Sequence, residues 1–90
     1  MLTVYTKTQC SFCDIAKTYL KAYEIPFTEV NIEEDAEARE FVLSKGHKTV
    51  PQIYRDGELF VEGGAQGLID TGHETIRERL GDLGLDGLTI

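Results

Sequence analysis

Residues 1–17 read MLTVYTKTQCSFCDIAK, and this stretch decides the fold of the chain. Residues 2–6 are rich in β-branched and aromatic side chains, which predicts a short strand. From Cys10 or Ser11 onward, three- and four-residue spacing of apolar residues predicts a helix with an apolar face of Ile15, Ala16, Tyr19, Leu20 and Tyr23. The motif CSFC contains the chain's only two cysteines and therefore lies where the strand ends and the helix begins.

The next part of the chain repeats the order of strand and helix. Residues 27–32 alternate apolar and polar side chains, as a half-buried strand does. The acidic run 33–35 suits the positive end of a helix dipole. We expect the helix that follows to run to Lys45, with Gly46 as its C-terminal cap, and to bury Ala38, Phe41 and Val42.

Two further strands and a helical region complete the pattern. Residues 50–55 and 58–61 predict strands, and Asp56-Gly57 between them is a strong signal for a two-residue hairpin turn. A weaker helical pattern follows, and Gly67 and Gly72 indicate that it comes in two pieces. Its apolar positions are Leu68, Ile69, Ile76, Leu80 and Leu83.

The order of elements is therefore β-α-β-α-β-β-α. The first strand-helix-strand unit predicts a right-handed parallel crossover, and the later hairpin adds antiparallel strands. We expect one α/β domain over residues 1–90, with a four-stranded mixed sheet, about three helices and a frayed tail after Gly81.

Composition excludes several classes of protein. A net charge of −7 argues against nucleic-acid or anionic-membrane partners, which need a basic patch. The excess acid lies between Glu33 and Glu40 and again after Asp70, and it is interpreted as a solvated face. We see neither a signal peptide nor an apolar run of the roughly 20 residues that a membrane span needs, so we expect a cytoplasmic protein.

The cysteine pair allows a metal site, a structural disulfide or a redox centre. A structural zinc site needs four ligands, whereas His47 and His73 lie in different loops and are expected at the surface. We therefore predict no metal. A structural disulfide is not favoured either. A disulfide that closes a loop of about four residues stabilises the folded chain by only about 2 kcal/mol, and a reducing cytoplasm would tend to open it.

The redox interpretation explains the position of the pair as well as its spacing. A thiol at a helix N-terminus meets unpaired N–H groups and the positive end of the helix dipole, which favour the thiolate. Lys7 lies three residues upstream and adds positive charge. We expect Cys10 to be the exposed nucleophile and Cys13, one turn further in, to resolve its mixed disulfide.

A second element supports this interpretation. In Thr49-Val50-Pro51 the proline belongs at a strand start or edge, because it cannot donate to a ladder. It is either a simple strand-entry proline or part of a cis Val50–Pro51 bond. The cis form would leave the N–H and C=O groups of Val50 free to pair with a cysteinyl substrate.

Together, YTKxxCxxC, TVPQIY and GG about a dozen residues later resemble the glutaredoxin family of the thioredoxin-like superfold. The resemblance covers residues 2–80. It implies a sheet order of 2-1-3-4, a cis Pro51 and reduction of protein disulfides and glutathione mixed disulfides by glutathione. It also implies that Cys10 attacks, Cys13 resolves and Lys7 supports the thiolate and the glycyl carboxylate of glutathione. The further glutathione contacts that it implies are Phe12, Thr49, Val50, Pro51, Gly63 and Gly64.

Two departures from the usual family pattern stand out. Ser11 and Phe12 replace the proline and tyrosine of CPYC, so residue 11 regains a backbone N–H and residue 12 lacks the hydroxyl. Gln66 and Gly67 stand where aspartates commonly bind the α-amino group of glutathione. A helix start at Ala65-Gln66 would still offer N–H groups to a carboxylate of glutathione.

The sequence thus predicts a monomeric, cytoplasmic dithiol oxidoreductase with glutathione as co-substrate and disulfide-containing proteins as clients. Two alternatives stay open. The VYTK and DAEARE segments resemble glutaredoxin-like electron donors of ribonucleotide reductase, which thioredoxin reductase reduces. Serine at residue 11 resembles dithiol members that carry a glutathione-ligated iron–sulfur cluster between two chains.

Overall fold

The computed structural model describes residues 1–81, which form four strands and four helices. Their order is β1 (Leu2–Thr6), α1 (Ser11–Ala22), β2 (Phe27–Asn31), α2 (Ala36–Ser44), β3 (Gln52–Arg55), β4 (Glu58–Val61), α3 (Gly64–Thr71) and α4 (His73–Arg79). About three helices were expected, with the last helical region in two pieces; these two pieces are α3 and α4, and they divide at Gly72, whereas Gly67 lies within α3. Gly72, with φ 86° and ψ 144°, takes a non-helical conformation between α3 and α4. The predicted tail after Gly81 and the predicted apolar position Leu83 lie outside the described residues.

The sheet has the expected order β2-β1-β3-β4. Strand β1 is parallel to β2 and antiparallel to β3, and β3 is antiparallel to β4. The hairpin turn between β3 and β4 is confirmed at Asp56-Gly57, where both residues have positive φ, 51° and 84°. Positive φ at both central positions is typical of the tight turns that join twisted strands.

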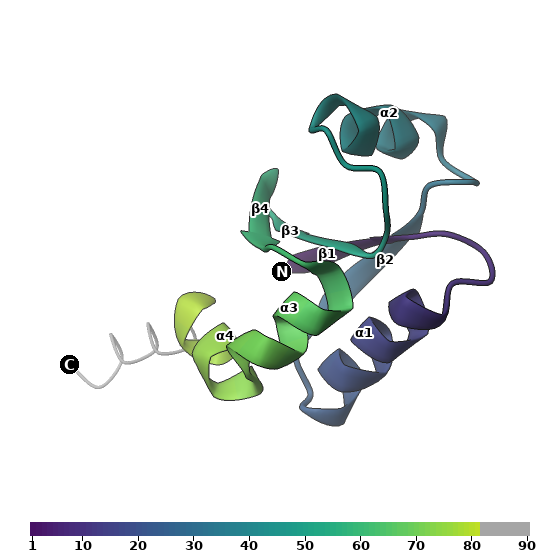
Figure 1. Ribbon diagram of the computed structural model, residues 1–90. Helices are drawn as coiled ribbons and strands as arrows, with labels where there is room; N and C mark the ends of the chain where they lie inside the picture. The colour runs from purple at the N-terminus through teal and green to yellow at the C-terminus, as the bar shows by residue number, and fades with distance from the viewer. Residues whose placement is uncertain (82–90) are drawn as a thin grey trace.

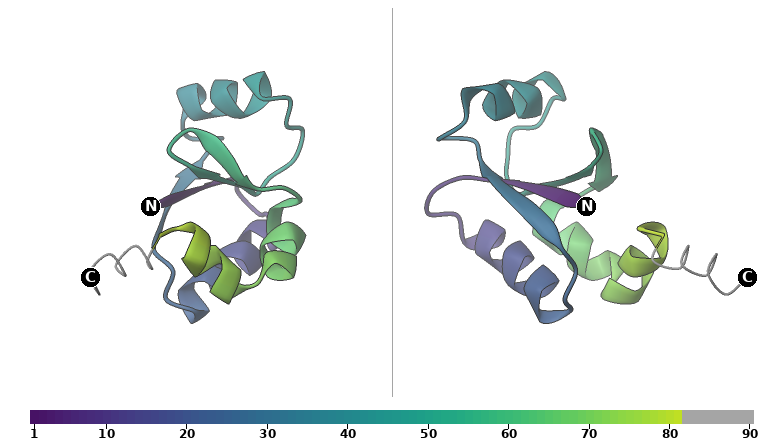
Figure 2. Two further views of the ribbon diagram at one scale, coloured as in Figure 1. Left: turned by 90° about the vertical axis from the view of Figure 1, so that its left-hand side faces the viewer. Right: turned by 180° about the vertical axis from the view of Figure 1, so that it is seen from behind.

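Helices cover both faces of this sheet. Figures 1 and 2 show that, of the four described helices, α1, α3 and α4 lie below it and α2 lies above it. The lower face holds the main core, since Leu2 and Val4 of β1 point there and pack with apolar side chains of the three helices. The buried members of this cluster are Leu2, Val4, Ala16, Leu20, Ile25, Ile53, Phe60, Val61, Ala65, Leu68 and Ile76.

The upper face is aromatic. The rings of Tyr5, Phe41 and Tyr54 meet pairwise, with centroid distances of 5.1 to 5.7 Å. Ala38 and Val42 of α2 are buried as expected, whereas Phe41 is only half-buried. Within residues 1–81 a single helix covers this face, and part of the ring cluster stays in contact with solvent.

Three predictions about which side chains are buried are wrong. Ile15 and Tyr23 do not face the core, because α1 buries only the narrower stripe of Cys13, Ala16 and Leu20. Strand β2 does not alternate between buried and exposed residues, since it is an edge strand with no fully buried side chain.

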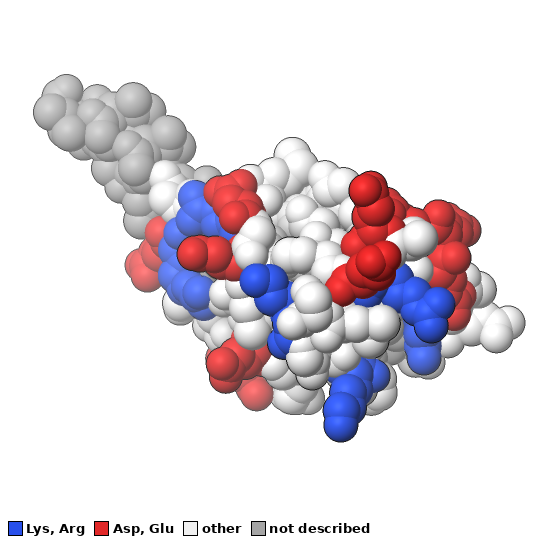
Figure 3. Space-filling model, turned by 90° about the horizontal axis from the view of Figure 1, so that it is seen from above, with Lys and Arg blue, Asp and Glu red and all other residues white. Residues whose placement is uncertain are grey.

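Acidic side chains lie around α2 on the upper layer. Figure 3 looks down on α2 and shows acidic side chains gathered over this helix and the turn before it. Of the excess acid predicted as a solvated face, the part before and within α2 lies on the layer opposite the CSFC helix, whereas Asp70, Glu74 and Glu78 lie on α3 and α4. Within residues 1–81, no helix is both long and apolar enough to span a bilayer.

Candidate redox site

The CSFC motif lies at the junction of β1 and α1, as expected. Cys10 is the N-cap residue of α1 and has extended backbone angles. Its sulfur accepts a hydrogen bond from the backbone N–H of Cys13 at 3.1 Å, and its carbonyl accepts one from Asp14 N–H at 3.1 Å. The N–H of Cys13, in the first turn of the helix, is therefore directed at the sulfur of Cys10, an arrangement that stabilises negative charge there.

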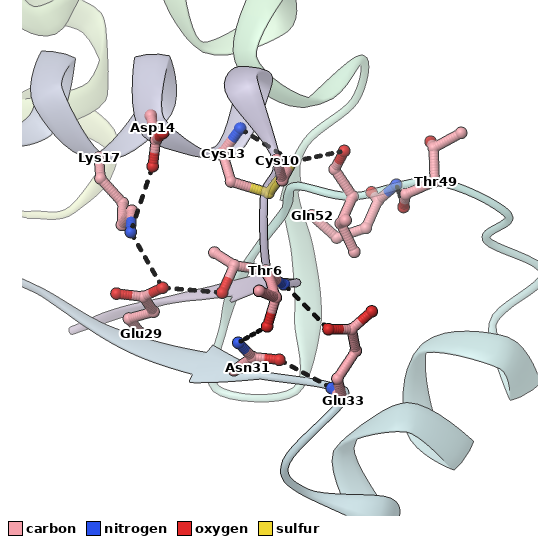
Figure 4. The surroundings of a disulfide bond; sticks show 12 residues. Thr6, Cys10, Cys13, Asp14, Lys17, Glu29, Asn31, Glu33, Thr49 and Gln52 are labelled. Atoms are coloured by element: carbon pink, nitrogen blue, oxygen red, sulfur yellow. Dashed lines mark hydrogen bonds and ion pairs between the residues drawn. A yellow bond between two sulfur atoms is a disulfide. The ribbon is translucent and has the colours of Figure 1, made fainter.

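The two cysteines form a disulfide with Cα atoms 5.2 Å apart (Figure 4). Cys10 is 8% exposed and Cys13 1%. The expected asymmetry is present, but the expectation that Cys10 is exposed is wrong for this disulfide form. The loop before β3 covers it, since the carbonyl oxygen of Val50 lies 3.8 Å from the sulfur of Cys10.

That loop is the second part of the site. The Val50–Pro51 bond is cis, the isomer that the family resemblance implies. The buried amide of Gln52 donates to the carbonyl of Thr49 at 2.8 Å and so ties the loop to the start of β3. Within residues 1–81, neither the N–H nor the C=O of Val50 has a backbone partner. An extended peptide placed here would find one donor and one acceptor.

The third part is the start of α3. A Cβ atom on Gly64 would lie 2.9 Å from the carbonyl oxygen of Pro51, so only glycine allows α3 to approach the loop this closely. Gly63 precedes it as the N-cap residue with φ 91°, which glycine adopts without steric cost. The Gly63-Gly64 pair is thus needed to bring α3 against the Thr49–Pro51 loop.

A groove of about 620 Å³ lies between these parts. It brings together eight of the nine residues predicted to contact glutathione, namely Phe12, Thr49, Val50, Pro51, Gly63, Gly64, Ala65 and Gln66. The ninth, Lys7, is exposed and does not line the groove, and it forms no ion pair within residues 1–81. Residues from three separate segments of the sequence therefore line the groove together.

Sequence reasoning missed four residues of this groove, which are His47, Gln52, Leu59 and Glu62. His47 was expected at the surface but is half-buried, because its Nε2 lies 2.6 Å from the hydroxyl of Tyr54. Burial raises the pKa of the Tyr54 hydroxyl. The position of His47 two residues before Thr49 was the available signal.

His73, which was also expected at the surface, is half-buried away from the groove. Its ring is stacked on Tyr23 with ring centroids 3.9 Å apart.

Gln66, which stands where the family commonly has a carboxylate, has a partner of its own. Its amide nitrogen donates to Asp70 at 2.9 Å, one helical turn along α3. The first carboxylate after the glycine pair is therefore held by Gln66, and Asp70 does not line the groove.

A polar network lies between the start of α1 and the sheet (Figure 4). The buried hydroxyl of Thr6 donates to Glu29 at 2.8 Å, and Lys17 donates to the same carboxylate oxygen at 3.1 Å. The hydrogen bond from Thr6, together with Lys17, lowers the pKa of Glu29 below its usual value. The network joins β1, β2 and α1 beside the cysteine pair. Among residues 1–81, no group of three or more His, Cys, Asp or Glu could hold a metal ion.

The chain is similar to known glutaredoxins and glutaredoxin-like proteins. The family model described as Glutaredoxin matches residues 2–60. The glutaredoxin-like protein NrdH of Lactococcus lactis subsp. cremoris is 40% identical over 60 residues, which is 67% of this chain and 83% of the relative. Glutaredoxin 3 of Escherichia coli K12 is 38% identical over 56 residues, 61% of this chain and 68% of the relative.

Among solved structures, the crystal structure of the buckwheat glutaredoxin–glutathione complex superposes with a TM-score of 0.72. The match covers 92% of this chain and 78% of that chain at 20% identity. It confirms the thioredoxin-like fold, and the sheet of this chain has the strand order that the family resemblance implies.

Proposed function

The chain belongs to the glutaredoxin family, and from this premise we propose that it reduces protein disulfides and glutathione mixed disulfides with glutathione as reductant. Membership of this family supports the interpretation that the chain is a redox protein with an active cysteine pair. The observation that carries the glutathione-specific part is the groove beside Cys10, because eight of the predicted contact residues line it together. We place this activity in the cytoplasm, in a protein that works as a monomer.

The proposed cycle begins with the reduced pair. The thiolate of Cys10 attacks a sulfur of the target disulfide, and the other sulfur leaves as a thiolate that takes up a proton. The thiolate of Cys13 then attacks the sulfur of Cys10, which releases the second target thiol and leaves the Cys10–Cys13 disulfide. The target gains two electrons and the cysteine pair loses two.

Two glutathione molecules restore the pair. The first glutathione thiolate attacks the sulfur of Cys10, forms a mixed disulfide there and frees Cys13. The second attacks the sulfur of the bound glutathione, which releases oxidised glutathione and the thiolate of Cys10. The N–H of Cys13, already directed at the sulfur of Cys10, stabilises this leaving thiolate.

Substitution of each cysteine tests the assignment of roles. Cys10→Ser should abolish all turnover in a coupled assay with glutathione, glutathione reductase and NADPH, since no nucleophile remains. Cys13→Ser should lose reduction of protein disulfides but keep reduction of glutathione mixed disulfides, which needs only one thiol. Turnover by the Cys10→Ser variant would contradict the proposed nucleophile.

A second candidate is an electron donor to ribonucleotide reductase that thioredoxin reductase regenerates. Two observations favour it: the 40% identity to the NrdH protein, and Gln66 in place of a carboxylate that would bind the amino group of glutathione. The test is to follow reduction of the oxidised protein by glutathione and by thioredoxin reductase with NADPH. Faster reduction by the second system would overturn glutathione as the reductant while leaving the cysteine chemistry intact.

A further inference from the structure

Helices α1 and α3 expose an apolar groove that thiol–disulfide exchange itself does not use. Its volume is about 440 Å³ and its lining is Asp14, Ile15, Thr18, Tyr19, Ala22 and Ile69. Ile15 is 43% exposed and Ile69 41%. Isoleucine is among the residues most often buried, so two exposed isoleucines at one groove form a surface that a partner would cover favourably.

This groove continues into the redox face along α1. Phe12 is 64% exposed and lines the groove beside Cys10. Ile15 follows three residues later, so the two side chains lie one turn apart on the same side of the helix. A partner molecule bound over Cys10 and Phe12 therefore reaches the α1–α3 groove if it extends one more turn along α1.

Exposed apolar side chains are concentrated on this side of the molecule. Within residues 1–81, six large apolar residues are exposed, and four of them lie on α1, at its end or on α3. These four are Phe12, Ile15, Tyr23 and Ile69. Figures 1 and 2 show α1 and α3 side by side on the face opposite the acidic α2.

The two grooves share no lining residue. A tripeptide bound between Thr49 and Gln66 would therefore leave the α1–α3 groove uncovered. A protein that presents its disulfide to Cys10 has a surface wide enough to cover both. The continuity through Phe12 thus favours a macromolecular occupant over a small one.

Resting on the proposed function, we propose that the α1–α3 groove is a docking surface for the protein that carries the target disulfide. The groove takes an apolar side chain that flanks the partner's reactive cysteine. Ile15 and Ile69 then determine how well the chain uses protein disulfides relative to small ones, without a part in the bond exchange.

The kinetic test compares the double variant Ile15→Gln, Ile69→Gln with Leu43→Gln, a matched control on α2 whose side chain is 56% exposed. Insulin serves as the protein disulfide, and the mixed disulfide of cysteine and glutathione serves as the small one. We expect the KM for insulin to rise about tenfold in the double variant, a loss of about 1.4 kcal/mol, with the small substrate unchanged. The control should match the parent protein with both substrates.

Unchanged insulin kinetics, or an equal loss with both substrates, would overturn the docking surface. Failure of the parent protein to reduce the small substrate would instead overturn the proposed function, so the two failures are distinguishable.

A second measurement does not depend on turnover. The Cys13→Ser variant forms a stable mixed disulfide at Cys10 with an insulin chain or with glutathione. The methyl resonances of Ile15 and Ile69 should shift in the insulin adduct and keep their positions in the glutathione adduct. Unshifted methyl resonances in the insulin adduct would contradict the proposal.

Discussion

The two faces of the sheet are built from the same strands but packed in different ways. Along β1, Leu2 and Val4 point to the lower face, and Tyr5 points to the upper one. Along β3, Ile53 joins the lower core and Tyr54 the upper ring cluster. The lower face buries aliphatic side chains under three helices, whereas the upper face packs aromatic rings under α2 alone.

The two faces therefore have different roles: the lower face holds the helix that carries the cysteine pair, and the upper face contacts the groove beside it. The CSFC helix packs on the closed lower face, where Leu20 and Ala16 are fully buried, so the cysteine pair is attached to the main aliphatic core. The upper face is partly solvated and reaches the groove through the hydrogen bond between His47 and Tyr54. Substitutions in the lower face should therefore lower the free energy of unfolding strongly. Substitutions in the upper face should lower it less.

The largest expected effect is that of Gly67→Ala on the lower face. A Cβ atom on Gly67 would lie 1.7 Å from the carbonyl oxygen of Glu62, so α3 would have to move away from β4. We expect a loss of about 3 kcal/mol or more in the free energy of unfolding, measured by urea denaturation. Gln66→Ala, at the exposed neighbouring position, is the control and should change stability by less than about 0.5 kcal/mol. Wild-type stability of Gly67→Ala would mean that α3 does not pack at this distance.

Leu20→Ala should be nearly as damaging. The side chain of Leu20 is fully buried in the lower core, so its truncation leaves a cavity as well as losing apolar contact. We expect a loss of about 3 kcal/mol by chemical denaturation. Leu43→Ala makes the same change at an exposed position of α2 and should cost less than about 0.5 kcal/mol. Equal effects at the two positions would contradict the described core.

Phe41→Leu addresses the upper face and should cost less. It removes the ring contacts with Tyr5 and Tyr54 but keeps much of the apolar volume. We expect a loss of about 1 kcal/mol. A double-mutant cycle with Tyr5→Leu should show coupling between the two positions, and a loss as large as that of Leu20→Ala would show that the upper face is equally closed.

Glu29→Gln should give the smallest effect, and that effect should depend on pH. The pKa of Glu29 is lowered in the folded protein, so its ionised form stabilises the fold above the usual carboxyl pKa near 4.5. This contribution is lost as the pH falls through the lowered value. Because Glu29 is partly exposed, we expect only about 0.5 kcal/mol at neutral pH. Denaturation from pH 7 down to pH 3 should show the two proteins converging in acid. A constant difference across this range would contradict the role of the charge.

Local patterns predicted most of the elements because the decisive residues act on their own neighbours. The Asp56-Gly57 turn, the Cys10 N-cap position and the non-helical Gly72 each depend on the conformation of one or two residues. The strand order came from the family resemblance rather than from any local pattern. The same local information failed where a residue's surroundings come from distant segments. Ile15 and Tyr23 match a helical apolar face, yet the core covers only the narrower stripe beside them.

The sequence by itself determined that a CxxC pair begins a helix after a strand, because spacing and periodicity are properties of the chain. Only the tertiary structure decided what surrounds that pair. The burial of Cys10 under Val50, the closeness of Gly64 to Pro51 and the entry of His47 into the groove join distant segments, and Cys10 and Val50 are 40 residues apart. Such contacts depend on how the sheet and helices pack together, and packing is a property of the whole fold rather than of any short stretch.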